Sequence, residues 1–359
     1  MWKANWEDTK KNFIDWWNHE GLILGVWRAP ETNQHVHEVC ERPRDPVSIE
    51  ESYASPVLRA RLNHWSLSRS IFPADVLPVS DTNIGPGSLA LFIGSEPGFS
   101  PDTVWFKPSI QDHPEPERLP PYRFDPSNRW WRVTEATLKA CAELGRGKYL
   151  VGCPDLVENI DILAALRDPQ TFLIDLVERP GWVEERVLEI NQVWFAAYER
   201  IYDIIKDPNG GSAFGAFSLW GPGRTAKVQC DAAAMISPAM FNRFVVPGLT
   251  EQCEWLDNSM YHLDGTQAMC HLDALLEIEA LDAIEWTPQS GIEGGGHPRW
   301  HEMYRRIVAA GKSVQTLGVR KDEVQPLLDA VGNKGIYIMP DMQDQADIDD
   351  FLDLIEPYR

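Results

Sequence analysis

The segment YHLDGTQAMCHLDALLEIEALDAIEW, residues 261–286, shows the pattern that decides the fold. An apolar run ends at the polar residues His262 and Asp264, an amphipathic stretch follows, and a second apolar run, LDAIEW, closes the segment. Short apolar runs of this kind predict buried strands, and a stretch of helical period predicts a helix between them. The segment therefore predicts one strand–helix–strand unit.

The same alternation runs through most of the chain. Apolar runs predict eight strands, at residues 22–27, 74–80, 148–152, 212–220, 259–263, 281–286, 312–317 and 335–340. The helices between them have recognisable ends: Pro180 lies in the first turn of one, and Ser237 with Pro238 begins another, which Pro247 should kink or split. Eight parallel strands with right-handed crossovers close into a barrel. We therefore expect an α/β fold, a (β/α)8 TIM barrel. We also expect residues 1–359 to form a single domain, with residues 1–70 as an N-terminal extension packed on the barrel.

An open, doubly wound sheet that binds a dinucleotide is the alternative architecture. It requires the pattern G-x-G-x-x-G directly after an early strand. The nearest match, GPGRTA at residues 221–226, has only two of the glycines. We therefore favour the barrel.

Composition and charge restrict the classes of partner. The formal charge of the 359-residue chain is -21, which repels phosphate backbones and anionic lipid, so we expect neither nucleic acid nor a membrane as partner. No apolar run approaches the roughly 20 residues of a membrane helix, and the first residues lack a signal-peptide stretch, so we expect a cytoplasmic protein. The six cysteines show no C-x-x-C spacing, which argues against a disulfide framework or a zinc knuckle.

Polar residues at the ends of the predicted strands should converge, because the loops after the strands of a barrel share one face. They are Asp81, Asn83, Asp155, Glu158, Asn159, Asp161, Arg224, Gln229, Asp231, His262, Asp264, Glu285, Gln315 and Asp341. His262 and Asp264 are two positions apart at a strand end, so both side chains project from one side and can bind one ion or one substrate. A turn in which Asp264 caps the next helix is the alternative. The second His-Leu-Asp copy, at His271 and Asp273, lies in a helical stretch and is expected to be structural.

Four stretches carry a resemblance to a known family. They are DTNIGPGSLALFIGSEPGFSPDTVWFKP, PDLVENIDILAALRDPQTFLIDLVERPGWVEERV, CDAAAMISPAMFNRFVVPGLTEQCEWLD and the segment 261–286. In this order they resemble the uroporphyrinogen decarboxylase superfamily, whose members are (β/α)8 barrels. The resemblance covers about residues 70–355. The superfamily includes the porphyrin decarboxylase and zinc-dependent methyltransferases that pass methyl groups to corrinoid proteins or thiols.

The resemblance implies a metal site with altered ligands. In the methyltransferases a His-x-Cys pair and a later Cys hold zinc, and a related methionine synthase adds a Glu. The matching positions here are His262, Asp264 for the first Cys, Glu285 for the Glu and, loosely, Asp341 for the last Cys. Both thiolates are missing. A histidine with carboxylates makes a harder, oxygen-rich site, compatible with zinc that holds an alkoxide or water, or with no metal.

The resemblance favours a methyltransferase-like enzyme that acts on a small methoxylated or quaternary-amine substrate at the C-terminal mouth of the barrel. It would use His262, Asp264 and Glu285 for catalysis, with zinc, if bound, held by the same three residues. Asp155, Glu158 and Asn159 would orient the substrate, and a corrinoid protein would take the methyl group. Further substrate contacts are expected from Asp231, Gln315 and Asp341, with apolar walls from Trp105, Trp220 and Trp286. Tetrapyrrole decarboxylation is not expected, because no arginine-rich segment precedes the first strand.

Two other classes of function remain open. In a carbohydrate-active enzyme, two of the strand-end carboxylates would act as acid and base on a glycosidic bond. In a non-catalytic binding protein, the barrel would persist after loss of the thiolate site.

Overall fold

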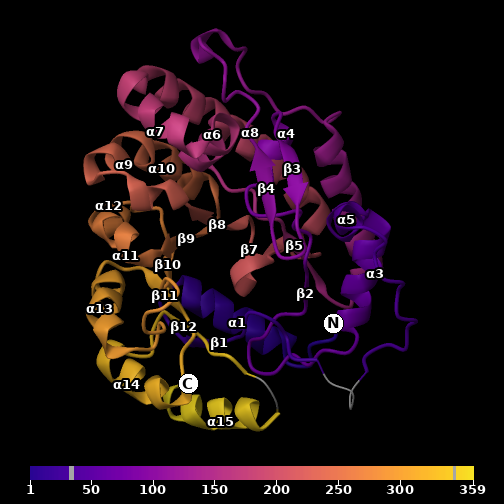
Figure 1. Cartoon of the computed structure of the whole chain (residues 1–359). Coiled ribbons are helices and arrows are strands. Elements are labelled where there is room, and N and C mark those ends of the chain that lie inside the picture. Colours follow the sequence, from indigo (N-terminus) through magenta and orange to yellow (C-terminus); the bar gives the residue numbers. More distant parts are fainter. Residues whose placement is uncertain (32–35, 343–344) are drawn as a thin grey trace.

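The structure, a computed structural model, describes residues 1–31, 36–342 and 345–359. Its strands lie in the interior and most helices surround them (Figure 1). The larger sheet has six parallel strands in the order β1-β12-β11-β10-β9-β8. They are β1 (Leu22–Leu24), β8 (Thr225–Gln229), β9 (Asn258–Asp264), β10 (Ala283–Thr287), β11 (Ser313–Leu317) and β12 (Ile336–Met339).

A second sheet has the order β2-β5-β6-β7. Its strands are β2 (Val79–Ser80), β5 (Leu150–Cys153), β6 (Gly211–Phe214) and β7 (Leu219–Pro222). β2, β5 and β6 are parallel, and β7 returns antiparallel to β6. A separate hairpin joins β3 (Glu96–Phe99) to β4 (Val104–Lys107). The fold is therefore mixed α/β, with a parallel six-stranded sheet as its largest unit.

Helices connect most of the strands. In chain order they are α1 (Trp6–Trp17), α2 (Ile49–Ala54), α3 (Pro56–Leu67), α4 (Leu89–Phe92), α5 (Arg129–Gly145), α6 (Asn159–Arg167), α7 (Pro169–Glu178), α8 (Pro180–Ile205), α9 (Pro238–Phe244), α10 (Val246–Trp255), α11 (Gly265–Ala268), α12 (Leu272–Leu276), α13 (His301–Ala309), α14 (Lys321–Val331) and α15 (Gln345–Ile355). None of these helices is both long and apolar enough to cross a membrane.

The predicted helix ends are confirmed at three places. Pro180 begins α8, and the Ser237 side chain accepts a hydrogen bond from the backbone of Met240 at the start of α9. Pro247 lies in the first turn of α10, and the predicted helix is split there into α9 and α10. A proline lacks an N–H, so it is tolerated in a first turn but breaks a helix interior.

The prediction of a single strand at residues 212–220 is wrong. The chain forms β6, turns through Ala216–Ser218 and returns as β7. Phe217 and Ser218 both have positive φ angles, of 61° and 50°, which a strand cannot contain. The next strand of the large sheet is β8, which the sequence did not predict.

The helix α1 covers the amino-terminal ends of the strands. Its Trp16 indole donates to the carbonyl of Val314 at 3.3 Å, and Ser313 at the start of β11 donates to the Trp16 carbonyl at 2.5 Å. The Trp17 indole donates to the Trp220 carbonyl in β7 at 2.9 Å. The carboxyl-terminal end of β11 therefore lies on the side away from α1.

Candidate functional site

A row of polar side chains crosses one face of the large sheet. Gln229, His262, Glu285, Gln315 and Tyr337 occupy equivalent positions of the neighbouring strands β8 to β12. Gln315 donates to the Phe217 carbonyl at 2.8 Å. The Tyr337 hydroxyl donates to the Ser218 carbonyl at 3.1 Å. The row therefore faces the β6–β7 connection, and a parallel sheet that is normally apolar is here polar on this face.

His262 is held by a buried carboxylate. Its Nδ1 hydrogen-bonds to Glu285, whose other oxygen accepts from the Thr287 hydroxyl at 2.7 Å. Burial disfavours the imidazolium, but the Glu285 carboxylate outweighs burial and raises the pKa of His262. Since Nδ1 is engaged, Nε2 is the ring nitrogen left to bind a ligand.

Two carboxylates face His262 at the carboxyl ends of neighbouring strands. Asp264 is the last residue of β9, and Asp231 lies two residues beyond the end of β8. One ligand atom each of Asp231, His262 and Asp264 lies within 4.8 Å of the others, a group able to hold a metal ion. Partial desolvation, reinforced by the charges of Asp155 and Asp264, raises the pKa of Asp231, although Lys227 and His262 oppose the effect.

This set differs from the predicted ligands His262, Asp264 and Glu285. Asp231, predicted as a substrate contact, lies beside His262 and Asp264, while Glu285 binds the other ring nitrogen of His262. A carboxylate behind a histidine fixes the tautomer and the ring orientation of a metal-binding imidazole. The geometry therefore suits Glu285 to orient the ligand His262.

Lys227 is a site residue that the sequence did not single out. It lies in β8, and its ammonium group, closed off from solvent, contacts both carboxylate oxygens of Asp155 at 2.8 Å. It also donates to Gln229, two positions further along the strand. The alternation in TAKVQ, which places Lys227 and Gln229 on one face, was the available signal.

The other predicted acids of the β5 loop lie deeper. Glu158 is buried and accepts the backbone N–H of Gln229, and burial raises its pKa well above the usual range. Asp161 accepts the backbone N–H groups of Asp231 and Ala232 at 2.6 and 2.8 Å, and burial followed by the charge of Asp231 raises its pKa to about 7. These acids therefore shape the loop that carries Asp231.

The charges around His262 do not cancel. Lys227 neutralises Asp155, His262 faces Glu285, and burial favours the protonated form of Glu158. Within the described residues, neither Asp231 nor Asp264 has an ion-pair partner. Both aspartates are exposed to solvent, and together with the imidazole of His262 they offer a divalent cation one nitrogen and two oxygen ligands.

The remaining predicted residues are dispersed. Asn159 is buried and faces Gly248 of α10, and Gln315 lies in the polar row. Asp341 is exposed, two residues beyond β12.

The three predicted tryptophan walls are not brought together. Trp286 is fully buried against Trp300, because its neighbour Glu285 takes the inner face of β10. Trp220 packs on Trp6 of α1, and Trp105 is half exposed on the β3–β4 hairpin. The rings beside His262 are instead Phe217, with centroids 4.7 Å apart, and behind it Trp27, 5.0 Å from Phe217.

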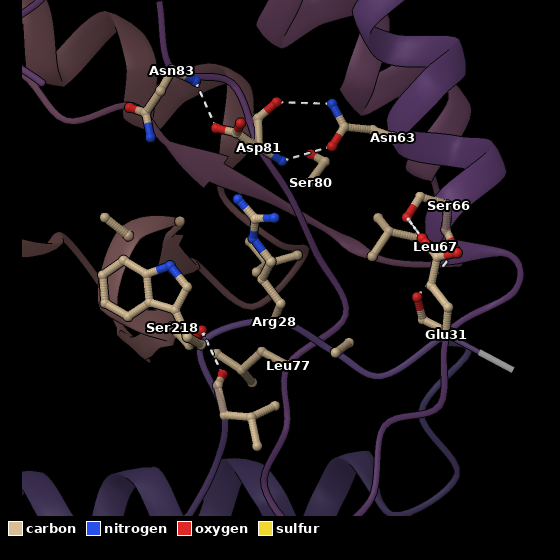
Figure 2. Close-up of a pocket in the computed structure, with 17 residues that line it drawn as sticks. Arg28, Glu31, Asn63, Ser66, Leu67, Leu77, Ser80, Asp81, Asn83 and Ser218 are labelled. Carbon is tan, nitrogen blue, oxygen red and sulfur yellow. Dashed lines mark hydrogen bonds between the residues drawn. The ribbon is translucent and has the colours of Figure 1, made fainter. Parts of the chain in front are cut away.

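A cavity of about 490 Å³ opens next to this group (Figure 2). Its walls come from the segments that follow β1, β2 and β6, including Trp27, Arg28, Asp81, Asn83 and Ser218. Phe217 lies between the wall residues Ala216 and Ser218 in the chain, and its ring contacts the His262 ring. The wall residue Asn83 also links the cavity to the polar site, because its side-chain oxygen accepts the backbone N–H of Asp155 at 2.5 Å.

Comparisons with known proteins identify a solved structure with a similar fold but no family for the chain. No family model matches the chain, and no curated protein does. Among solved structures, the chain is similar to a methyltransferase from Methanosarcina mazei, with a TM-score of 0.60 and 11% sequence identity over 98% of each chain. The chain therefore shares its overall fold with this structure over nearly the whole length of both chains.

Proposed function

We propose that this chain is a methyltransferase-like enzyme that binds a divalent cation, with zinc the first candidate, at Asp231, His262 and Asp264. The observation that carries the proposal is the convergence of Asp231, His262 and Asp264, with Nδ1 of the imidazole fixed by Glu285. The shared fold with a methyltransferase supports it. One nitrogen and two oxygen donors suit zinc and harder divalent metals. Thiolate ligands would instead select softer metals.

The substrate that fits these ligands is a small methoxylated molecule. A bound cation would stabilise the negative charge that develops on the substrate oxygen. In the transfer, the O–CH3 bond breaks, its electron pair stays on the oxygen, and the methyl group bonds to a nucleophile of the acceptor. The oxygen then takes a proton from water. Glu285 keeps the imidazole in the orientation that directs Nε2 to the site.

The acceptor in this proposal is a separate corrinoid protein, and the enzyme works in the cytoplasm. The uroporphyrinogen decarboxylase-like ancestry inferred from the four sequence stretches is part of the same proposal. A quaternary-amine substrate is less well supported, because Trp105, Trp220 and Trp286 do not form a cage.

We also propose that the two sheets close into the predicted (β/α)8-type barrel. Two contacts between the two sheets support closure. At one, β6 contacts β8, and at the other the backbone of Asp75, before β2, donates to the carbonyl of Leu24 in β1 at 2.9 Å. A closed barrel would bring all carboxyl-end loops to one mouth.

The test of the proposed function is metal titration followed by turnover. Chelator-treated full-length protein should bind one zinc ion, and Asp264→Asn should weaken binding at least tenfold. Asp273→Asn in the second His-Leu-Asp copy is the matched control, since Asp273 is exposed and pairs with Arg306. With reduced cobalamin as acceptor, methoxylated substrates should yield methylcobalamin only with the metal-loaded protein.

Other outcomes would replace the proposal. Cleavage of a glycoside by the metal-free protein would favour the carbohydrate-active class. Binding without turnover of any methoxylated or glycosidic substrate would favour a non-catalytic binding protein. Equal zinc affinity in Asp264→Asn and the unaltered chain would remove the metal site.

A further inference from the structure

The cavity beside the acid–histidine group is walled by side chains able to bind a ligand. It lies at the carboxyl ends of β1, β2 and β6, and its volume of about 490 Å³ is within the range of small-molecule sites. The Phe217 ring, whose chain neighbours Ala216 and Ser218 line the cavity, lies 4.7 Å from the His262 ring, so a ligand here would lie near the proposed metal.

Arg28 provides an anion-binding group in this cavity. Figure 2 shows its side chain extending from the segment after β1 toward Asp81. In the part of the chain that the structure describes, its guanidinium makes no hydrogen bond or ion pair, although the protein carries a net charge of -21. The planar guanidinium binds a carboxylate through two parallel hydrogen bonds.

Two acids lie in the same wall as Arg28. Glu31 accepts a hydrogen bond from Ser66 at 2.8 Å, and Asp81 accepts one from the backbone of Asn83 at 2.9 Å. Each carboxylate keeps further acceptor capacity for ligand hydroxyl groups. Asp81 also pairs with Arg59 at 3.4 Å, so the two arginines balance the two acids and the formal charge at this wall is near zero, which leaves Arg28 able to bind a single ligand carboxylate.

The remaining wall suits a ring. The Trp27 indole is about half exposed and is held edge-on by Phe217, and an exposed indole face packs well against the flat face of a small ring.

We propose that this cavity binds the non-reacting part of the substrate, and that this part is a hydroxylated monocarboxylate of sugar-acid size. Arg28 binds the carboxylate, Asp81 and Glu31 accept hydroxyl groups, and Trp27 packs on the ring. The inference rests on the proposed function in placing the reacting oxygen at the metal site, but the binding itself requires no metal.

Calorimetric titration of the full-length, chelator-treated protein tests the inference. The probes are glucuronate, galacturonate, gluconate and quinate, with glucose as the match that lacks the carboxylate and cyclohexanecarboxylate as the match that lacks hydroxyl groups. At least one hydroxy acid should bind about tenfold or more tightly than either match. Arg28→Gln should abolish that preference, and Arg28→Lys should retain part of it because the charge stays while the fork is lost.

Arg61→Gln, an exposed arginine of α3 outside the cavity wall, is the control and should bind like the unaltered chain. Binding of none of the four hydroxy acids at millimolar concentration, or equal binding by Arg28→Gln, overturns the inference. Asp264→Asn should leave hydroxy-acid binding intact. A protein that binds hydroxy acids but no metal would contradict the proposed function alone.

Discussion

Lys227 shows how a single residue can organise the acids around it. Its ammonium is excluded from solvent, binds both oxygens of Asp155 and donates to Gln229 on the same face of β8. Its charge lowers the pKa of Asp231 against the effect of desolvation. Removing one partner of such a pair leaves the other charge buried without compensation.

Lys227→Met is therefore expected to lower the free energy of unfolding by about 3–5 kcal/mol, and Asp155→Asn by a similar amount. The double variant should lose less than the sum of the two single losses, because it leaves no buried unpaired charge. Urea denaturation of all four proteins measures the coupling. Strictly additive losses would mean that the ion pair does not hold the loop after β5.

At this scale the sequence predicts part of the site and misses part of it. His262 and Asp264 were found because both lie at the end of a strongly apolar strand. Asp231 was predicted as a substrate contact, and Lys227 was overlooked, because both depend on β8, which has too few apolar residues to be recognised. The tryptophans were misplaced because neighbouring strand residues point to opposite faces.

The elements were predictable where local signals agree. The strand–helix alternation, the Ser237 cap and the break at Pro247 all follow from local chemistry. The β6–β7 turn was not predictable, because Phe217 and Ser218 adopt positive φ without being glycine. Gln315 and Tyr337 hold the carbonyl groups of this turn from the other sheet, so tertiary contacts decide its conformation.

The start of α5 offers a test of an element. The Asn128 side chain accepts the backbone N–H groups of Trp130 and Trp131 at 2.8 and 3.0 Å, and it donates to the Leu91 carbonyl at 3.1 Å. Asn128→Ala should cost about 1 kcal/mol or more of stability, because two helix-end donors lose their acceptor. Asn128→Asp keeps the acceptor and should lose less. Equal midpoints of urea unfolding for the Ala and Asp variants would show that the cap contributes nothing.

The whole molecule should lose stability at alkaline pH because its cysteines are buried. Burial raises the pKa of Cys141 to about 11 and of Cys253 to about 12, from the ordinary 9.0. The folded state therefore keeps protons that the unfolded chain releases, so stability present below pH 9 is lost as the pH rises toward the folded pKa values.

Each of these thiols should lower the free energy of unfolding by about 1.4 kcal/mol per pH unit between pH 9 and 11. Urea denaturation under reducing conditions at pH 9.5 and 10.5 measures the slope. The Cys141→Ala, Cys253→Ala double variant should show a slope smaller by about 2.8 kcal/mol per pH unit in this range. An identical slope would mean that these thiols already ionise in the folded protein.

We propose that Asp231, His262 and Asp264 together bind a divalent cation and that Glu285 orients the imidazole of His262 from behind. An anomalous difference map from crystals grown with zinc tests it most directly. We expect one peak at the carboxyl ends of β8 and β9, about 2.0–2.2 Å from His262 Nε2 and from an oxygen of each aspartate. A peak on Glu285 instead, or no peak at saturating zinc, would contradict it.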